Sequence, residues 1–487
     1  MAVALAGSLL APAAAMARPA DTVEMPNHCK ASYNIAAERG YDVSRVARDR
    51  RVVFDGREAR LTPGGWNTRH SRDPSWTLWF HSMVWLVPLA LEDPATAVAV
   101  MVERDKALPD PGAGVDKSSR QSTGWTQGQA RTRLQVVTCL YTLTGAPELV
   151  RVAERLVRAN LDPKRYPGPP YRPVHNHGTM SNIALVQAAS EFDRPEWAKA
   201  AVTRFSRDLP YVFDRCGMMR EQSSTYQEHN VSLWDRAARL LDVDLRVQRE
   251  ALQALVRPDG VLEAIGDGQP MTHVPPNGMD LWCPEPGWAA ATRGGMHYVL
   301  RFGPSVDYHG HLDHGAATWF TQGVPVLSDR GLYGKERGAR LTYARGMSAH
   351  SVFEPVGTAS YDPDTRGARL GPDRFELKDA QGGISRTRTI TIGDTTLTVD
   401  DRGRGARAWI QHWQLAPGWT PTATGAVHDV AGLTLTVDCP SLKAVKVEAF
   451  VARRTAVAAW DLQCIVKGKD SRGEVRQRTT LTVRAAP

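Results

Sequence analysis

The spacing of apolar residues changes once along the chain, near Gly266, and this change constrains the fold more than any other feature. From Asp93 to about Val256, apolar side chains recur every three or four residues, as on one face of an α-helix. Beyond Gly266 they alternate with polar residues, as in half-buried strands. A run of helices followed by a run of strands predicts separate α and β domains rather than one parallel α/β sheet.

The length of the chain, 487 residues, also favours two large domains over a single core. The helical segments are joined by brief loops, which is typical of a bundle, a solenoid or a toroid. Gly145, followed by Pro147, is expected to end one helix and open the next. A segment rich in Gly and Pro predicts a linker over 271–290, between a helical domain over 18–270 and a β domain over 291–487. The β domain is long enough for a large antiparallel sandwich.

The first residues are typical of an export signal. Val3–Leu10 is an apolar stretch, and the A-x-A sequence that ends at Ala17 is typical of a cleavage site. This pattern predicts a signal peptide over 1–17 and a secreted or periplasmic protein. The apolar stretch is too short to span a membrane and no other segment approaches the necessary length, so we expect no membrane insertion.

The six cysteines are widely spaced and include no C-x-x-C pair. Disulfides are allowed in an exported protein, and buried free thiols are the alternative. Cys439 and Cys464 are the first pair to test, because both lie in the C-terminal half.

The net charge of the chain is +8 and its pI is about 9.2. A basic surface of this kind favours a polyanionic partner. The export signal argues against nucleic acid as that partner, and the sequence has no recognition motif or dense basic stripe.

The motif HNHGTMSN contains two groups that can bind a carboxylate. Asn176 and His177 come just before a helix that is expected to begin near Thr179. An amide and an imidazole at such a place can donate hydrogen bonds to a substrate carboxylate and stabilise charge that builds on it. A helix cap beside a surface histidine is the alternative interpretation.

The motif REQSSTYQEHNVSLW predicts a helix whose N-cap is Ser223 or Ser224. Tyr226 falls in its first turn, and Asn230 shares that face four residues later. A tyrosine near cations can accept or donate a proton. A core tyrosine on an amphipathic helix is the alternative.

The segment HGHLDHG places three histidines within six residues. An extended strand would put His309 and His311 on one face, and only a bend at Gly310 would give each its own role. His311, with Asp329 and His350 downstream, forms a set of two imidazoles and one carboxylate that suits zinc. The wide spacing means that such a site would tie separate strands together.

Together these motifs resemble those of the heparinase II/III-like polysaccharide lyases, which include heparinases and oligoalginate lyases. The resemblance is carried by NHG at 176–178, by Tyr226 after a turn rich in Glu and Ser, by HGHLDHGAATWFTQGVPVLSDRGLYG and by RGMSAHSV. It covers about Arg172 to Val352. WIQHWQLAPGW resembles a later strand of the family's sandwich.

The resemblance implies an N-terminal (α/α) toroid followed by a C-terminal antiparallel β-sandwich, with a polysaccharide cleft. It implies that Asn176 and His177 neutralise a uronate carboxylate. Tyr226 would be one catalytic acid or base, and His309 a second one.

The resemblance also implies a structural zinc ion held by His311, Asp329 and His350, with His314 as a bystander. Two groups of candidate substrate-binding residues remain. Arg131 and Arg345 are either cleft cations or solvated surface charges, and a second aromatic acid would be Tyr333 or Tyr343.

The expected function is therefore cleavage of an acidic polysaccharide by β-elimination at a uronic acid. The polymer stays open among glycosaminoglycans such as heparin or heparan sulfate, alginate and glucuronan. A glycoside hydrolase is the first alternative; it needs two carboxylates in one cleft, and Glu221, Glu228 and Asp267 are available. A glycan-binding protein without catalysis is the second.

Overall fold

The computed structural model describes most of the chain. The described residues are 25–42, 44–62, 65–67, 74–115, 120–121, 123–241, 244–275, 278–305, 308–335, 337–358, 361–468 and 473–486. The predicted signal peptide over 1–17 lies outside them. Within these ranges no helix is long and apolar enough to cross a membrane.

Contacts between residues divide the chain into two compact units. The first comprises Met1–Pro173 and Met180–Ala201, and the second comprises Val174–Thr179 and Val202–Pro487. The predicted domain boundary near residue 270 stays a prediction, since the compact units divide earlier in the chain.

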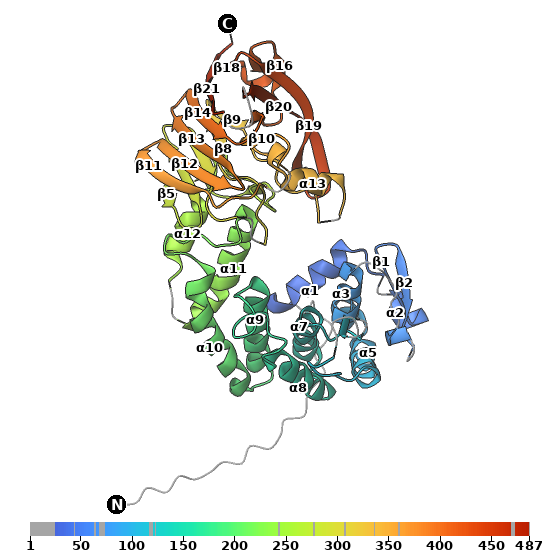
Figure 1. The fold of residues 1–487 in the computed structure, drawn as a ribbon. Coiled ribbons are helices and arrows are strands. Elements are labelled where there is room, and N and C mark those ends of the chain that lie inside the picture. The colour runs from blue at the N-terminus through green and yellow to red at the C-terminus, as the bar shows by residue number, and fades with distance from the viewer. Residues whose placement is uncertain are drawn as a thin grey trace, which may run out of the picture. The chain divides into compact units, whose positions relative to one another are not determined.

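Helices make up most of the first unit (Figure 1). Its elements are α1 (Asn27–Glu38), α2 (Ser44–Asp49), β1 (Arg51–Phe54), β2 (Arg57–Arg60), the short 3-10 helix η1 (Gly65–Asn67), α3 (Pro74–Ser82), α4 (Leu86–Glu92), α5 (Pro94–Ala107), α7 (Gln127–Thr144) and α8 (Glu148–Leu161). Helix α7 contacts α1, α3, α4, α5 and α8. Thr126 and Gln129 form a capping box at its start, and Gly145 ends it in the left-handed conformation with φ 65°, as predicted.

Four further helices follow along the chain. They are α9 (Asn176–Glu191), α10 (Pro195–Val212), α11 (Ser224–Leu241) and α12 (Arg246–Gln253). Helices α11 and α12 belong to the second unit. The hydroxyl of Ser224 accepts a hydrogen bond from the backbone N–H of Ile265 at 3.0 Å, which joins the start of α11 to the segment that leads into the strands.

The second unit contains three larger antiparallel sheets (Figure 1). The five-stranded sheet has the order β5 (Asp280–Cys283), β6 (Trp288–Arg293), β7 (Met296–Arg301), β8 (Ala316–Thr321), β9 (Val324–Leu327). The eight-stranded sheet has the order β11 (Arg366–Gly371), β12 (Arg374–Gln381), β13 (Ile384–Ile392), β14 (Thr396–Arg404), β21 (Val475–Ala485), β18 (Leu433–Asp438), β17 (Gly425–His428), β16 (Thr420–Thr422). The four-stranded sheet has the order β10 (Phe353–Pro355), β15 (Ala408–Gln414), β20 (Thr455–Lys467), β19 (Leu442–Ala452).

One apolar core joins these three sheets. It includes Trp319 from the five-stranded sheet, Ile390 and Leu481 from the eight-stranded sheet, and Trp413 and Leu462 from the four-stranded sheet. Strand β13 alternates between buried and less buried residues along its length, which is the period of two expected from the sequence. The sheet-rich C-terminal half is thereby confirmed.

The segment predicted as a linker, 271–290, contains regular structure. Strand β4 (Met271–Thr272) pairs with β3 (Val261–Leu262), and β5 and the first residues of β6 also fall in this segment. Leu281 and Cys283 on β5 are buried whereas Asp280 is exposed, so a short alternating strand lies within the Gly- and Pro-rich stretch.

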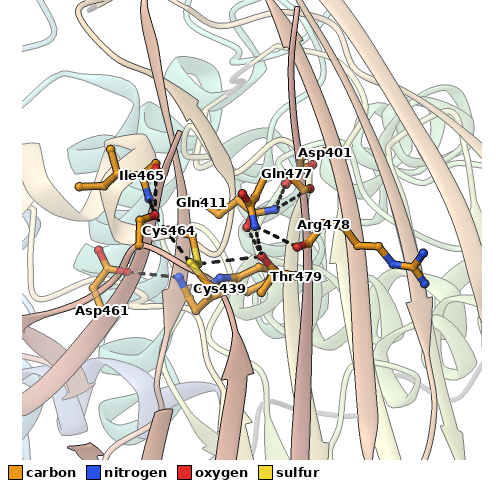
Figure 2. The surroundings of a disulfide bond; sticks show 11 residues. Asp401, Gln411, Cys439, Asp461, Cys464, Ile465, Gln477, Arg478 and Thr479 are labelled. Carbon is orange, nitrogen blue, oxygen red and sulfur yellow. Dashed lines mark hydrogen bonds between the residues drawn. A yellow bond between two sulfur atoms is a disulfide. The ribbon is translucent and has the colours of Figure 1, made fainter. Parts of the chain in front are cut away.

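The six cysteines form three disulfides. Their pairs are Cys29–Cys139, Cys216–Cys283 and Cys439–Cys464. The third is the pair first proposed from the sequence, and the alternative of buried free thiols is wrong. Figure 2 shows its surroundings, where Thr479 donates a hydrogen bond to the sulfur of Cys464 at 3.9 Å.

A buried histidine of the four-stranded sheet makes the stability depend on pH. The Nδ1 of His412 lies 2.7 Å from Asp461, and its Nε2 lies 2.8 Å from Glu354. Burial alone would lower the pKa of His412, but hydrogen bonds to Asp461 and Glu354 raise it to about 9. The folded protein therefore holds this proton more tightly than the unfolded chain does, whose histidine pKa is about 6.5.

The stability contributed by that proton is complete below pH ~6.5 and is lost as the pH rises through the folded pKa. We expect the free energy of unfolding to fall by about 3 kcal/mol more in the wild type than in His412→Gln between about pH 6 and about pH 10. Urea unfolding across this range measures the difference. Parallel pH profiles of the two proteins would contradict the prediction.

Candidate active site

The HGH segment bends so that its first two histidines have different surroundings. The side chain of His309 is 15% exposed and that of His311 is fully buried. Gly310 packs closely against Gln222, because a Cβ there would lie 2.2 Å from Oε1 of Gln222, and the turn that precedes it includes Tyr308, with φ 42°. His309 and His311 therefore lie in different environments, and separate roles for them stay a prediction. All the contacts described for this site lie within the second unit.

His309 stacks on Tyr226. The two ring centroids are 3.5 Å apart and the ring planes differ by 8°. Tyr226 occupies the first turn of α11, which begins at Ser224 as the sequence predicts. The helix start thus places a phenol directly against an imidazole from the HGH segment.

Lys335 completes the surroundings of the phenol. Its Nζ donates a hydrogen bond to the Tyr226 hydroxyl at 2.5 Å and lies 5.0 Å from the centre of the tyrosine ring. The lysine side chain is 56% exposed, so it can also reach a bound ligand. A cation, a phenol and an imidazole therefore meet at one place.

Asp267 lies beneath this group and is fully buried. Its carboxylate accepts hydrogen bonds from Nδ1 of His309 at 3.0 Å, from Nε2 of His311 at 3.1 Å and from Arg345 at 3.0 Å. Burial alone would raise the pKa of the Asp267 carboxyl, but the hydrogen bonds from the two histidines and the charge of Arg345 hold it well below its ordinary value. Asp267 is therefore an anion at neutral pH.

The second nitrogen of His309, Nε2, lies 3.5 Å from Oε2 of Glu221. Burial lowers the pKa of His309 despite its hydrogen bond to Asp267, and the charges of Lys335 and Arg345 lower it further. The imidazole is accordingly neutral at neutral pH and able to accept a proton.

The NHG motif lies close to the HGH segment. Helix α9 begins at Asn176, three residues earlier than expected. The N–H of His177 donates to Nδ1 of His175 at 3.1 Å. The ring of His175 meets that of Tyr308 edge-on, with centroids 5.5 Å apart. Tyr308 directly precedes His309, so the two motifs are joined by aromatic contact.

Asn176 is buried and His177 is exposed. The side-chain oxygen of Asn176 has no hydrogen-bond partner among the described residues. As it stands, this amide oxygen can accept a hydrogen bond from a ligand; rotation of the amide would present its NH₂ group as a donor to a ligand oxygen.

The predicted substrate-binding residues lie in different places in the structure. Arg345 is 43% exposed and contacts Asp267, within the site. Tyr333 and Tyr343 both pack against Phe450, with ring centroids 5.5 and 6.5 Å away. Arg131 lies in the first unit, buried on α7, where it donates to the sulfur of Met180 at 3.0 Å. Substrate contact stays a prediction for each of them.

The three predicted metal ligands come together. One ligand atom each from His311, Asp329 and His350 lies within 4.8 Å of the others, and all three residues are buried. Nδ1 of His311 and Nε2 of His350 are buried and have no hydrogen-bond partner among the described residues. Two unpaired imidazole nitrogens beside a carboxylate fit a divalent metal ion.

His314 is separate from both groups. It is buried, and its Nε2 lies 3.2 Å from Oδ1 of Asp362. This contact gives His314 a partner of its own, and its role as a bystander stays a prediction.

Three residues of the site were not recognised from the sequence. Asp267 was named only as a carboxylate for a hydrolase, and Lys335 and Tyr308 were not named at all. The pattern Gly266-Asp267-Gly268 was a local signal for a turn with an inward carboxylate. Lys335 has no such signal, because only the fold brings it to Tyr226.

These observations define a two-unit α and β protein with a phenol–imidazole pair beside a candidate metal centre. Residues 275–408 match the family described as Heparinase II/III-like, C-terminal. The matched residues contain the HGH segment, Lys335 and all three candidate metal ligands. The predicted resemblance is confirmed.

Solved structures of similar fold extend the likeness over most of the chain. Heparinase III has a TM-score of 0.71 at 13% identity, covering 96% of this chain and 87% of that one. A mutant of the heparan sulfate lyase HepC from Pedobacter heparinus has a TM-score of 0.67 at 14% identity, covering 96% and 85%. A chondroitin AC lyase from Streptomyces coelicolor, in complex with chondroitin sulphate, has a TM-score of 0.55 at 12% identity, covering 97% and 81%. These TM-scores show that the chain shares its fold with the three lyases. No curated protein matches the chain by sequence.

Proposed function

We propose that the chain is a polysaccharide lyase that cleaves a uronic-acid-containing polymer by β-elimination. The observation that carries the proposal is the stack of Tyr226 on His309, with Lys335 bonded to the phenol. The shared fold with heparinase III, heparan sulfate lyase and chondroitin AC lyase supports it. The net charge of +8 suits an anionic polysaccharide as partner.

In this proposal the site performs two proton transfers. Tyr226 or His309 takes the proton at C5 of the uronate, and the electrons of that C–H bond move to form the C4–C5 double bond as the C4–O bond breaks. The departing glycosidic oxygen then receives a proton. The donor is the residue of this pair that did not act as the base, or Tyr226 itself if it has taken the C5 proton. Asn176 and His177 bind the uronate carboxylate and stabilise the charge that develops on it. No covalent intermediate is needed.

The finer structural features belong to the same proposal. The helices form an (α/α) toroid and the sheets a β-sandwich, as the likeness to the lyases supports. The sequence over 1–17 is a signal peptide, and the mature protein is secreted or periplasmic. Substrate classes to test are heparin and heparan sulfate, other glycosaminoglycans, alginate and glucuronan.

The metal in the proposal is zinc, held by His311, Asp329 and His350. Its role is to tie together three separate segments of the second unit. We expect purified protein to contain about one zinc ion per chain and His350→Ala to lose it, with a lower melting temperature. Elemental analysis measures the content, and His314→Asn is the matched control that should keep the metal. A wild type without bound metal would contradict this assignment.

A glycoside hydrolase is disfavoured by the state of two of its three candidate carboxylates, Asp267 and Glu221. Asp267 is buried and engaged by two histidines and an arginine. Glu221 is also buried, on the other side of His309. Neither carboxylate is placed to work across an open cleft on a glycosidic bond.

The test is ultraviolet absorbance while purified protein is mixed with heparosan, heparan sulfate, hyaluronan, chondroitin, alginate and glucuronan in turn. A rise from the unsaturated product on one polymer is the expected result, and it names the substrate. New reducing ends without that absorbance would mean hydrolysis. Binding without either signal on any polymer would favour a glycan-binding protein that lacks catalysis.

A further inference from the structure

One buried carboxylate contacts two histidines of the HGH segment at once. Oδ2 of Asp267 lies 3.0 Å from Nδ1 of His309, and Oδ1 lies 3.1 Å from Nε2 of His311. The two imidazoles therefore contact Asp267 through different ring nitrogens, His309 through Nδ1 and His311 through Nε2.

An ionised carboxylate only accepts hydrogen bonds. Each imidazole must therefore direct its N–H at Asp267, and in the neutral ring the remaining nitrogen then carries a lone pair. For His309 this nitrogen is Nε2, and for His311 it is Nδ1.

The remaining nitrogen of each ring lies where its lone pair could bind a metal ion or accept a proton. Nδ1 of His311 is buried and has no hydrogen-bond partner among the described residues, and His311 belongs to the candidate metal cluster with Asp329 and His350. His309 is stacked on Tyr226 and is partly exposed; its Nε2 is the nitrogen not engaged by Asp267 and lies 3.5 Å from Oε2 of Glu221. A metal would need the tautomer of His311 with its lone pair on Nδ1, and proton transfer would need the tautomer of His309 with its lone pair on Nε2. Both histidines contact Asp267.

We propose that Asp267 is a positioning residue that fixes the tautomers of both histidines, so that the candidate metal centre and the proton-transferring imidazole share one carboxylate. The His309 part rests on the proposed lyase function. The His311 part rests only on metal binding.

The surroundings of Asp267 hold the carboxylate in place for this role. Its backbone N–H donates to the carbonyl of His309 at 2.7 Å. Gly266 before it has φ 64°, and a Cβ there would lie 2.5 Å from the carbonyl oxygen of Gln222 and 2.7 Å from that of His309. Arg345 bonds to both carboxylate oxygens, at 3.1 and 3.0 Å. The turn and the cation therefore keep Asp267 under the two imidazoles.

Asp267→Asn tests the proposal with nearly the same shape. The amide offers one acceptor oxygen and one NH₂ donor, so it cannot accept from both rings. One histidine must change its tautomer. Asp362→Asn is the matched control, because Asp362 makes a similar contact with His314 at 3.2 Å, outside the site.

Either of two losses is expected in Asp267→Asn. A change at His309 would lower kcat by about 10²-fold or more with little change in KM. A change at His311 would weaken zinc binding by about 10–100-fold, measured by competition with a chelator. Retention of both kcat and zinc affinity at the level of Asp362→Asn would overturn the proposal.

A measurement on wild-type protein covers the case in which Asp267→Asn does not fold. Nitrogen-15 NMR of histidine-labelled protein, with His309→Asn and His311→Asn used for assignment, reports the tautomers directly. The expected result is N–H on Nδ1 of His309 and on Nε2 of His311, and the opposite assignment for either ring would contradict the proposal. A wild type without lyase activity but with these tautomers would refute the proposed function and leave the role of Asp267 standing.

Discussion

Replacing Tyr226 with phenylalanine is expected to lower kcat for polysaccharide cleavage by about 10²–10⁴-fold, the usual contribution of a general acid or base. The substitution removes only the hydroxyl, which receives the hydrogen bond from Lys335, and leaves the ring that stacks on His309. The fold should therefore survive, and KM should change little. Initial rates on the substrate found in the polymer panel measure the effect.

Tyr141→Phe is the control for this substitution. Tyr141 stacks on Phe192 in the first unit, with centroids 4.3 Å apart, and its hydroxyl has no role in the proposed chemistry. Wild-type activity is expected for that variant. If Tyr226→Phe retained the wild-type kcat, the phenol would not transfer a proton and the proposed mechanism would be wrong.

Asp401→Ala is expected to lower the free energy of unfolding by about 3–5 kcal/mol, the cost of removing one partner of a buried ion pair. Arg388 on β13 and Asp401 on β14 face each other across the eight-stranded sheet, and two of their N–O distances are 2.9 Å. Asp401 also accepts from Gln411 at 2.8 Å, as Figure 2 shows. The substitution leaves Arg388 buried with no carboxylate at these distances.

This ion pair also supports the candidate site. Nη1 of Arg388 donates to the carbonyl of Gly315 at 2.7 Å and to that of Ser351 at 2.6 Å. Ser351 follows the candidate metal ligand His350, and Gly315 ends the HGH segment, so loss of stability should be accompanied by weaker zinc binding.

Urea unfolding measures the change in stability, and Asp400→Ala is the matched control. Asp400 is the neighbouring residue on β14 and pairs with the exposed Arg476, an interaction of small net effect. Equal unfolding free energies for the two variants would show that the buried pair contributes no more than the exposed one.

The general fold could be predicted because its signals are local. The change of apolar period near Gly266 separates helices from strands, and Gly145 ends α7 through a conformation that glycine adopts without strain. Strand β5 was not anticipated within the predicted linker, because a four-residue strand among glycines and prolines has too short an alternating pattern to stand out. Helix α9 begins earlier than expected since its first residues, Asn176 and His177, are weak helix formers by themselves.

The candidate site could be predicted only in part. His311, Asp329 and His350 were recognisable because their residue types suit a metal and their motifs resemble those of a known family, and the structure brings them together. The contact of Lys335 with Tyr226 joins residues 109 positions apart, and that of Asp267 with His309 joins residues 42 apart. Such pairings depend on tertiary structure and have no local pattern.

Cleavage in water enriched with heavy oxygen distinguishes elimination from hydrolysis. In elimination the broken bond leaves the original oxygen on the departing sugar and a double bond on the uronate, so mass spectrometry should find no heavy oxygen incorporated by cleavage and products lighter by one water than those of hydrolysis. Incorporation of one heavy oxygen at each cleaved bond would mean that the protein is a hydrolase and not a lyase.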